Sequence, residues 1–197
     1  MSATPTKLET LAIHGGTPVR DTLLPYGRQS LDEEDIQAAV DVLKSDWLTT
    51  GPKVGEFEER FAAWVGTKHA VSFSSGTAAL HASAFAAGLK SGDEAITTPM
   101  TFCATANCVL YQGATPMFAD VSADTLNLEP REVSKKISSR TKALIAVDYA
   151  GHPADLAALR DLASQHGLVL IEDACHALGA EFLGERVGGI ADMTVFS

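Results

Sequence analysis

Hydrophobic and polar residues follow one pattern in the first third of this chain and another pattern after it. Up to about residue 68, apolar residues recur every three or four positions, which predicts amphipathic helices over residues 30–45 and 54–66. In the first of these helices, Ser30 followed three residues later by Glu33 predicts a capping box. The second helix is expected to turn its large apolar residues inward: Val54, Phe57, Phe61, Trp64 and Val65.

From His69 onward, short apolar runs alternate with helical patterns. Strands are predicted over residues 69–73, 94–99, 115–120, 142–149, 168–174 and 192–197. Helices are predicted between them over residues 76–88, 102–113, 129–137 and 154–167, with a short hairpin over 180–189. The strands are apolar on both faces, which is typical of a mainly parallel sheet covered by helices on both sides. The expected fold class is therefore α/β with three α/β/α layers.

Composition narrows the kind of protein. A chain of 197 residues that is 46% hydrophobic can bury a sizeable core, and its net charge of -10 argues against nucleic acid as a partner. The first residues lack the pattern of a signal peptide, and no apolar run is long enough to span a bilayer. Three cysteines without zinc-type spacing favour reduced thiols and no metal site. We therefore expect a cytoplasmic protein without a membrane partner.

Candidate chemistry gathers at the predicted strand ends, where ligands bind in parallel sheets. Ser75, Gly76 and Thr77 follow the first predicted strand and open the helix over residues 76–88. Backbone N–H groups, hydroxyls and a permissive glycine at a helix N-terminus can bind a phosphate dianion. An ordinary N-cap would use the same residue types, and the segment matches neither a P-loop nor the GxGxxG dinucleotide motif.

Two further strand ends carry polar or aromatic candidates. Asp173 ends a buried strand, where a carboxylate needs a positive partner such as a protonated ring nitrogen, although it could also cap the following turn. Phe102 could stack on a flat cofactor and His176 could contact a ligand oxygen, but a phenylalanine or a lone histidine at such a position is more often a core residue. Tyr149 lies in a loop fixed by Gly151. A phosphate cradle, a stacking ring and a carboxylate on successive strand ends together indicate pyridoxal 5'-phosphate.

Six ordered motifs carry a resemblance to a known family: "SSGTAALH", "ITTPMTFCATAN", "GATPMFADV", "RTKALIAVDYAGHPAD", "LVLIEDACHALGA" and "VGGIADMTVFS". In these motifs the chain resembles the DegT/DnrJ/EryC1/StrS sugar aminotransferases, which are pyridoxal-phosphate enzymes with the aspartate aminotransferase fold. The turn signals "HGGTP" and "LPYG" predict an irregular N-terminal arm over residues 1–30, and the resemblance implies an incomplete cofactor-binding large domain over residues 31–197. It also implies a homodimer whose active sites draw residues from both chains.

The resemblance assigns roles to individual residues. It implies that the cofactor phosphate is bound by Ser75, Gly76, Thr77 and Ser197. Phe102 would stack on the pyridine ring. Asp173 and His176 would be the catalytic residues, with Asp173 paired to the ring nitrogen and His176 near the ring's phenolic oxygen. By the same resemblance, the expected substrate-binding residues are Thr49, Thr50, Lys53 and Tyr149.

Within the family the motifs are most similar to transaminases that make UDP-4-amino-4,6-dideoxy-N-acetyl-beta-L-altrosamine on the pseudaminic acid route. The implied reaction converts a UDP-4-keto-6-deoxy-hexose to the 4-amino sugar with glutamate as amino donor, and the cofactor passes through pyridoxamine 5'-phosphate. Alternatives are enzymes that form UDP-4-amino-4-deoxy-L-arabinose, perosamine-type aminotransferases, and a lysine-less, pyridoxamine-dependent sugar dehydratase. A non-enzymatic binding module has little support.

The family's Schiff-base lysine lies a few residues beyond the position that matches Ser197. We therefore expect this chain to be an N-terminal fragment of a complete transaminase, without the lysine, the rest of the large domain and the small domain. Transamination needs that amine, so the fragment itself is expected to be inactive.

Overall fold

The computed structural model describes residues 10–25 and 27–197, and the chain divides into two units, Met1–Thr49 and Thr50–Ser197. This division follows contacts within the chain. The predicted boundary between an arm over residues 1–30 and a domain over residues 31–197 stays a prediction, and residues 1–9 of that arm lie outside the described residues.

In the first unit, the predicted capping box is displaced by two residues. Helix α1 (Glu33–Lys44) has Asp32 as its N-cap: the carboxylate accepts the N–H groups of Glu34 and Asp35 at 2.9 and 3.1 Å. The Asp35 carboxylate in turn accepts the N–H of Asp32, which completes the box. Ser30 and Glu33 do not form it. Aspartate is as good an N-cap as serine, and here it stands where the helical conformation begins.

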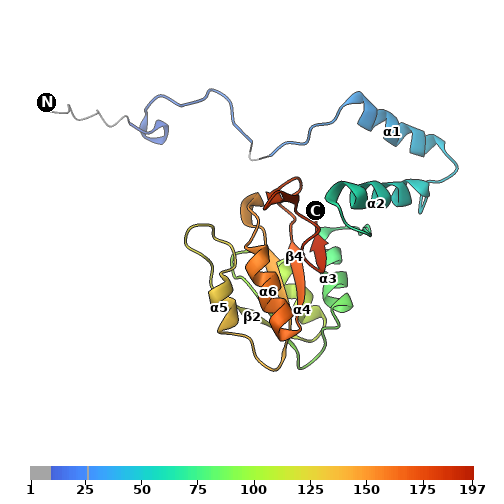
Figure 1. Ribbon diagram of the computed structural model, residues 1–197. Helices are drawn as coiled ribbons and strands as arrows, with labels where there is room; N and C mark the ends of the chain where they lie inside the picture. The colour runs from blue at the N-terminus through green and yellow to red at the C-terminus, as the bar shows by residue number, and fades with distance from the viewer. Residues whose placement is uncertain (1–9, 26) are drawn as a thin grey trace. The chain divides into compact units, whose positions relative to one another are not determined.

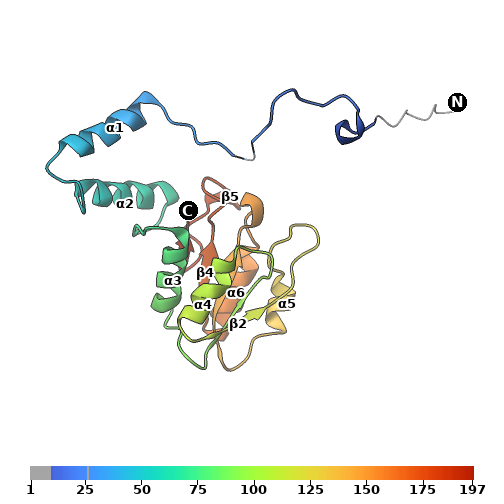
Figure 2. The same ribbon diagram turned by 180° about the vertical axis from the view of Figure 1, so that it is seen from behind.

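The second unit contains a five-stranded sheet between two layers of helices (Figures 1 and 2). Its helices are α2 (Pro52–Val65), α3 (Gly76–Ala86), α4 (Cys103–Tyr111), α5 (Pro130–Ser134) and α6 (Leu156–His166), with the 3-10 turn η2 (Tyr149–Gly151). The sheet strands are β1 (Glu94–Thr97), β2 (Thr115–Phe118), β3 (Thr141–Val147), β4 (Val169–Asp173) and β7 (Met193–Val195). Strands β5 (Glu181–Phe182) and β6 (Glu185–Arg186) form a separate antiparallel hairpin.

The sheet order is β2-β1-β3-β4-β7, and every neighbouring pair is parallel. Helices α3 and α4 cover one face, and α5 and α6 cover the other. Successive side chains of each strand point to opposite faces of the sheet. Ile145 and Ile171 pack with α3 and α4, whereas Leu144 and Leu170 pack with α6. Burial on both faces explains the uniformly apolar strands, and the predicted three-layer α/β class is confirmed.

The strand predicted over residues 69–73 is not formed. Val71 and Phe73 are exposed, and the N–H of Ser72 donates to the carboxylate of Glu58 at 2.7 Å instead of to a neighbouring strand. A strand needs a partner for its backbone, and no segment of the described residues pairs with this one.

Helix α2 buries less than its pattern predicts. Val54, Phe57 and Trp64 are exposed, while Val65 and Ala62 are buried. Besides the hydrogen bonds of Glu58 with Ser72, contacts of α2 with the rest of the unit come from its last turns. Phe61 packs edge-on against Phe196 with ring centroids 5.3 Å apart, and the guanidinium of Arg186 lies 4.5 Å from the centre of the Trp64 ring. Within residues 10–25 and 27–197, no helix is long and apolar enough to cross a membrane.

Candidate functional site

A cavity of about 430 Å³ opens at the carboxyl ends of the sheet strands. Its walls come from the start of α3, the segment between β1 and α4, the end of β3 with η2, the end of β4 and the residues after β7. It brings together every residue predicted to bind the cofactor: Ser75, Gly76, Thr77, Phe102, Asp173, His176 and Ser197. Tyr149, predicted to bind substrate, lines the same cavity.

The N-terminus of α3 forms one wall of this cavity. Ser75 is the N-cap, and its hydroxyl accepts the N–H of Ala78 at 3.2 Å, so the ordinary capping role is real. The N–H groups of Gly76 and Thr77, in the first turn, have no acceptor within the helix. A Cβ on Gly76 would lie 2.9 Å from the Cβ of Ser197 and 3.2 Å from the sulfur of Cys175. Glycine therefore lets the hydroxyl of Ser197 approach the positive end of the helix.

A buried carboxylate lies at the end of β4. Asp173 is 6% exposed, and its Oδ2 accepts the hydroxyl proton of Thr105 at 2.6 Å. Thr105 is fully buried and shares a 2.7 Å hydrogen bond with the hydroxyl of Thr101, which lines the cavity. The N–H of Cys175 reaches Oδ1 only at 3.4 Å, so the predicted turn cap exists but is long. Oδ1 can therefore serve a second donor.

The structure rejects the core alternative for Phe102 and His176. Phe102 is 72% exposed although it lines the cavity, and His176 is exposed as well. Neither side chain is held by the packing that a core residue would have. Gly151 adopts a φ of +85° and packs so closely that a Cβ would meet the carbonyl oxygen of His176 at 2.9 Å. Glycine at this position therefore lets the backbone of η2 approach the backbone of His176 closely.

Two cysteines stand close to the carboxylate. Burial, with Asp173 adding to the effect, raises the pKa of the Cys175 thiol to about 12, and burial and the Asp173 charge raise the pKa of the Cys108 thiol to about 12. Both thiols are therefore neutral near pH 7, and neither supplies a thiolate nucleophile.

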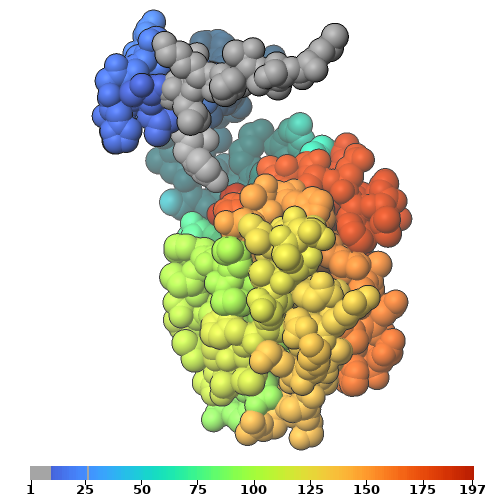
Figure 3. Space-filling view, turned by 90° about the vertical axis from the view of Figure 1, so that its left-hand side faces the viewer, coloured from blue at the N-terminus to red at the C-terminus, as the bar shows by residue number. Residues whose placement is uncertain are grey.

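Asn127 is a site residue that the sequence did not single out. Its side chain, in a residue 3% exposed, donates to the carbonyl oxygens of His152 and Pro153 at 2.8 and 3.0 Å and accepts the N–H of Tyr149 at 3.0 Å. In the space-filling view, the segment after β2 (yellow) lies against the segment after β3 (light orange) (Figure 3). The amide of Asn127 thus fixes the turn that carries Tyr149. The sequence also did not single out Thr105, the hydrogen-bond donor to Asp173.

Three predicted substrate-binding residues do not line the cavity. Thr49 and Thr50 precede α2 and are exposed, and the ammonium of Lys53 pairs with the carboxylate of Glu56 at 2.6 Å. Their role in substrate binding stays a prediction.

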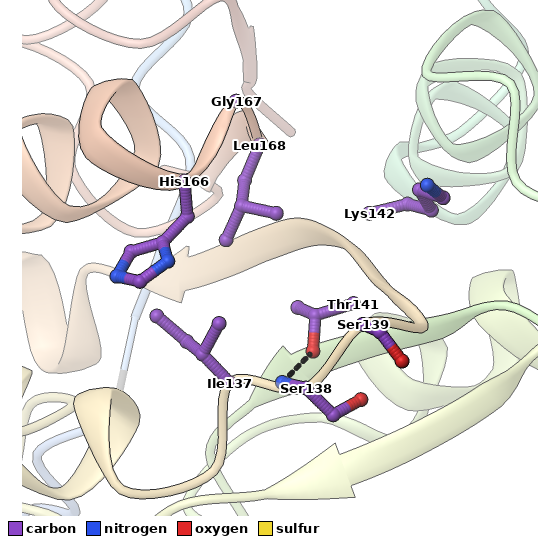
Figure 4. Close-up of a pocket in the computed structure, with 8 residues that line it drawn as sticks. All are labelled: Ile137, Ser138, Ser139, Thr141, Lys142, His166, Gly167 and Leu168. Carbon is purple, nitrogen blue, oxygen red and sulfur yellow. Dashed lines mark hydrogen bonds between the residues drawn. The ribbon is translucent and has the colours of Figure 1, made fainter.

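A second cavity, of about 420 Å³, lies at the opposite edge of the sheet, at the amino ends of β3 and β4 (Figure 4). The side chains of Ile137, His166 and Leu168 gather around one space, and the hydroxyl of Thr141 accepts the N–H of Ser138 at 2.9 Å. No buried carboxylate lines this cavity, and no helix as long as α3 begins there. Parallel sheets bind ligands at the other edge, so this cavity is not the candidate site.

Comparison with known proteins supports the assignment of the fold and identifies the family. The model of the DegT/DnrJ/EryC1/StrS aminotransferase family matches residues 29–197. The protein MJ1066 of Methanocaldococcus jannaschii is 46% identical over 179 residues, which cover 91% of this chain and 46% of that protein. The spore coat polysaccharide biosynthesis protein SpsC of Bacillus subtilis is 44% identical over 178 residues, covering 90% and 46%. The chain therefore spans about half the length of the curated relatives it matches.

Solved structures agree with these relatives. The structure of Helicobacter pylori PseC, an aminotransferase involved in the biosynthesis of pseudoaminic acid, has a TM-score of 0.83 and 39% identity over 88% of this chain and 47% of that chain. Spr1654 of Streptococcus pneumoniae, a sugar aminotransferase by its description, has a TM-score of 0.82 and 33% identity over 88% and 48%, and is known in PLP and PMP forms. The predicted aminotransferase large-domain fold is confirmed. The chain belongs to the DegT/DnrJ/EryC1/StrS aminotransferase family, a family of pyridoxal-phosphate-dependent enzymes.

Proposed function

We propose that this chain is the cofactor-binding part of a pyridoxal-phosphate-dependent aminotransferase that acts on a nucleotide sugar. The observation that carries the proposal is the meeting of two groups in one cavity: the N-terminus of α3 with the hydroxyl of Ser197, and the buried carboxylate of Asp173. These groups match the two charged ends of pyridoxal phosphate, which are its phosphate and its protonated ring nitrogen.

The residues of the cavity fit this cofactor. Because Gly76 has no Cβ, the hydroxyl of Ser197 can lie close to the start of α3, where a phosphate would meet both this hydroxyl and the first N–H groups of the helix. The exposed ring of Phe102 is free to stack on a flat heterocycle. Ser75, Thr77 and Ser197 add hydroxyls at the phosphate end. The cavity of about 430 Å³ falls within the range typical of cofactor sites.

When bound, pyridoxal phosphate supplies an electron sink and a carbonyl that can receive and release an amino group. In this chain, Asp173 would hold a proton on the ring nitrogen, and Thr105 would orient Asp173 through its 2.6 Å hydrogen bond. Phe102 would exclude water from one face of the ring. His176, exposed on the cavity wall, would donate to or accept from the ring's phenolic oxygen.

For the substrate, we propose a UDP-4-keto-6-deoxy-hexose that is aminated at C4 with glutamate as donor, as a step in the synthesis of a surface glycan of the pseudaminic acid type. The likeness to PseC and to SpsC supports this choice. Tyr149 would contact the sugar from the cavity wall, and Thr49, Thr50 and Lys53 would contact the nucleotide. The active protein would be a homodimer.

The test uses the complete product of the gene, purified with pyridoxal phosphate. Incubation with glutamate and the UDP-4-keto sugar should yield the UDP-4-amino sugar and 2-oxoglutarate in equal amounts, measured by mass spectrometry. The same UDP-sugar with a 4-hydroxyl group serves as the matched control and should not react. Loss of a sugar hydroxyl without transfer of nitrogen would contradict the proposal and indicate a dehydratase.

A further inference from the structure

Two carboxyl groups are buried at the carboxyl ends of β3 and β4, and one of them, Asp148, belongs to a residue that also lines the cavity. Glu172 and Asp148 are both fully buried. Glu172 of β4 pairs in register with Ala146 of β3, and Asp148 follows Ala146 by two positions. Because side chains alternate between the two faces of a strand, Glu172 and Asp148 point to the same face, where α6 packs.

Each of these carboxyl groups has one satisfied and one unsatisfied oxygen. The hydroxyl of Thr194 donates to Oε2 of Glu172 at 2.7 Å, and the N–H of Ala154 donates to Oδ1 of Asp148 at 3.0 Å. Oε1 of Glu172 and Oδ2 of Asp148 are buried and have no hydrogen-bond donor among residues 10–25 and 27–197. A buried polar atom without a partner is costly, and a proton placed between two carboxyl oxygens satisfies both of them.

The surroundings of the pair favour that proton. Desolvation is the main cause that raises the pKa of Glu172 and of Asp148, and the charge of Asp148 raises the pKa of Glu172 further. Asp173 acts on Asp148 in the same direction, and only His152 opposes it among the nearby charges.

Apart from His152, α6 and β7 bring the pair no cationic side chain among the described residues. From α6, the apolar Leu156 and Leu159 cover this face, and the guanidinium of Arg160 is bound to the carboxylate of Asp192 at 2.8 Å and to the carbonyl oxygen of Ile190. The β7 side contributes the neutral hydroxyl of Thr194.

We propose that Asp148 and Glu172 share a single proton at neutral pH, and that the resulting hydrogen bond fastens the carboxyl ends of β3, β4 and β7 beside the cavity. The pair joins β3 to β4 directly, and Thr194 extends the connection to β7. It is a positioning pair, because both side chains are fully buried and hold their neighbours Tyr149 and Asp173 in place.

Asp148 itself lines the cavity, and every member of this network is close in sequence to a further residue that lines it. Asp148 precedes Tyr149, Glu172 precedes Asp173, and Thr194 lies three positions before Ser197. The role of Tyr149, Asp173 and Ser197 at a cofactor rests on the proposed function. The shared proton and the fastening of the strand ends do not depend on the proposed function.

The first test is Glu172→Gln, with the exposed Glu185→Gln as matched control. The amide of the variant can donate to Oδ2 of Asp148 while its carbonyl accepts from Thr194, so the hydrogen bond is kept without a titrating proton. The wild type and the control should show the infrared carbonyl band of a protonated carboxyl near pH 7, and Glu172→Gln and Asp148→Asn should both lack it. A band that is absent from the wild type, or that persists in both amide variants, would overturn the shared proton.

The second test uses amide hydrogen exchange, without cofactor, to measure how firmly the strand ends are held together. The N–H of Asp148 donates to the carbonyl oxygen of Asp173 at 3.1 Å, and the N–H of Ala174 donates to that of Val195 at 2.8 Å, so these two amides report the junctions β3–β4 and β4–β7. Their exchange should accelerate at least about tenfold in Thr194→Val or Glu172→Ala and stay near the wild-type rate in Glu172→Gln. Unchanged protection in the first two variants would overturn the positioning role. Because no cofactor is present, failure of the proposed function would not affect this result.

Discussion

Thr105 and Asp173 form a 2.6 Å hydrogen bond in the interior of the protein, in which the threonine hydroxyl donates to Oδ2 of the carboxylate. The acceptor stands at the end of β4 and the donor on α4, so the bond joins a sheet strand to the helix layer that covers it. It fixes the carboxylate while Oδ1 retains only a 3.4 Å contact with the N–H of Cys175. The arrangement suits a carboxylate that must hold one orientation toward a ligand.

Replacing Thr105 with valine should weaken cofactor binding through Asp173. The variant keeps the shape of the side chain but removes the donor, and the free energy of unfolding should fall by about 1–3 kcal/mol because a buried carboxylate oxygen is left unpaired. The dissociation constant for pyridoxal phosphate, measured by fluorescence titration, should rise about tenfold. Thr101→Val is the matched control and should change both quantities less, since Thr101 does not touch Asp173. Equal effects of the two variants would contradict the orienting role.

Asp173→Asn tests the carboxylate itself. The amide oxygen can still accept from Thr105, so the free energy of unfolding should change by less than about 1 kcal/mol. The affinity for pyridoxal phosphate should fall more than about tenfold, because a neutral amide cannot stabilise a protonated ring nitrogen. Chemical denaturation and equilibrium titration on the same preparation measure the two effects. If stability and affinity fall together by similar free energies, Asp173 is only a cap for the turn that follows it.

Gly76→Ala should remove the phosphate site. The added Cβ would lie 2.9 Å from the Cβ of Ser197, so either the start of α3 or the residues after β7 must move. Binding of pyridoxal phosphate, and of inorganic phosphate as a competitor, should be lost in calorimetric titration. Gly55→Ala is the control, because a Cβ there meets nothing within 4 Å, and it should leave binding unchanged while stabilising α2 by up to about 1 kcal/mol. Wild-type affinity in Gly76→Ala would place the phosphate elsewhere.

The buried carboxyl pair gives stability a defined dependence on pH. The pKa values of Glu172 and Asp148 are raised in the folded state by burial, so above about pH 4 the native state binds more protons than the unfolded chain. Stability due to this pair is full below about pH 4 and declines as pH rises through the raised pKa values. Between about pH 5 and about pH 9, the unfolding midpoint of the wild type should fall more steeply than that of Glu172→Gln. Parallel curves would show that the pair does not titrate as described.

Asn127→Ala should destabilise the turn that carries Tyr149. The variant removes three hydrogen bonds from a residue that is 3% exposed, which corresponds to about 2–4 kcal/mol of unfolding free energy. The amide of Tyr149, whose N–H loses its acceptor, should exchange faster in hydrogen-exchange measurements. Asn107→Ala on α4 serves as control and should cost less than about 1 kcal/mol. If Asn127→Ala lowered the free energy of unfolding no more than Asn107→Ala does, the result would contradict the role of Asn127 in stabilising this turn.

The sequence predicts the sheet and much of the cavity because both depend on local patterns. Strands such as β3 and β4 are apolar on both faces, which indicates a parallel sheet, and in such a sheet the residues after the strands meet at one edge. Gly76, Phe102 and Asp173 could therefore be assigned to one site before the structure was known. Whether each side chain is exposed or buried could not be predicted. The exposure of Phe102 is what identifies it as a cavity residue and not a core residue.

Other features depend on partners that are distant in sequence. Residues 69–73 have the composition of a strand, but a strand forms only where a neighbour pairs with it. Asn127 acts on a turn more than twenty positions later, and nothing in its own neighbourhood predicts this contact. The pair of Asp148 and Glu172 becomes visible only when the register of β3 and β4 places both on one face.

The most direct test of the central claim is a crystal structure of the protein grown with pyridoxal phosphate. The account predicts the phosphate within hydrogen-bond distance of the N–H groups of Gly76 and Thr77 and of the hydroxyl of Ser197, with the ring nitrogen facing Asp173. A cofactor bound in another cavity, or bound in this one with its ring nitrogen turned away from Asp173, would contradict it.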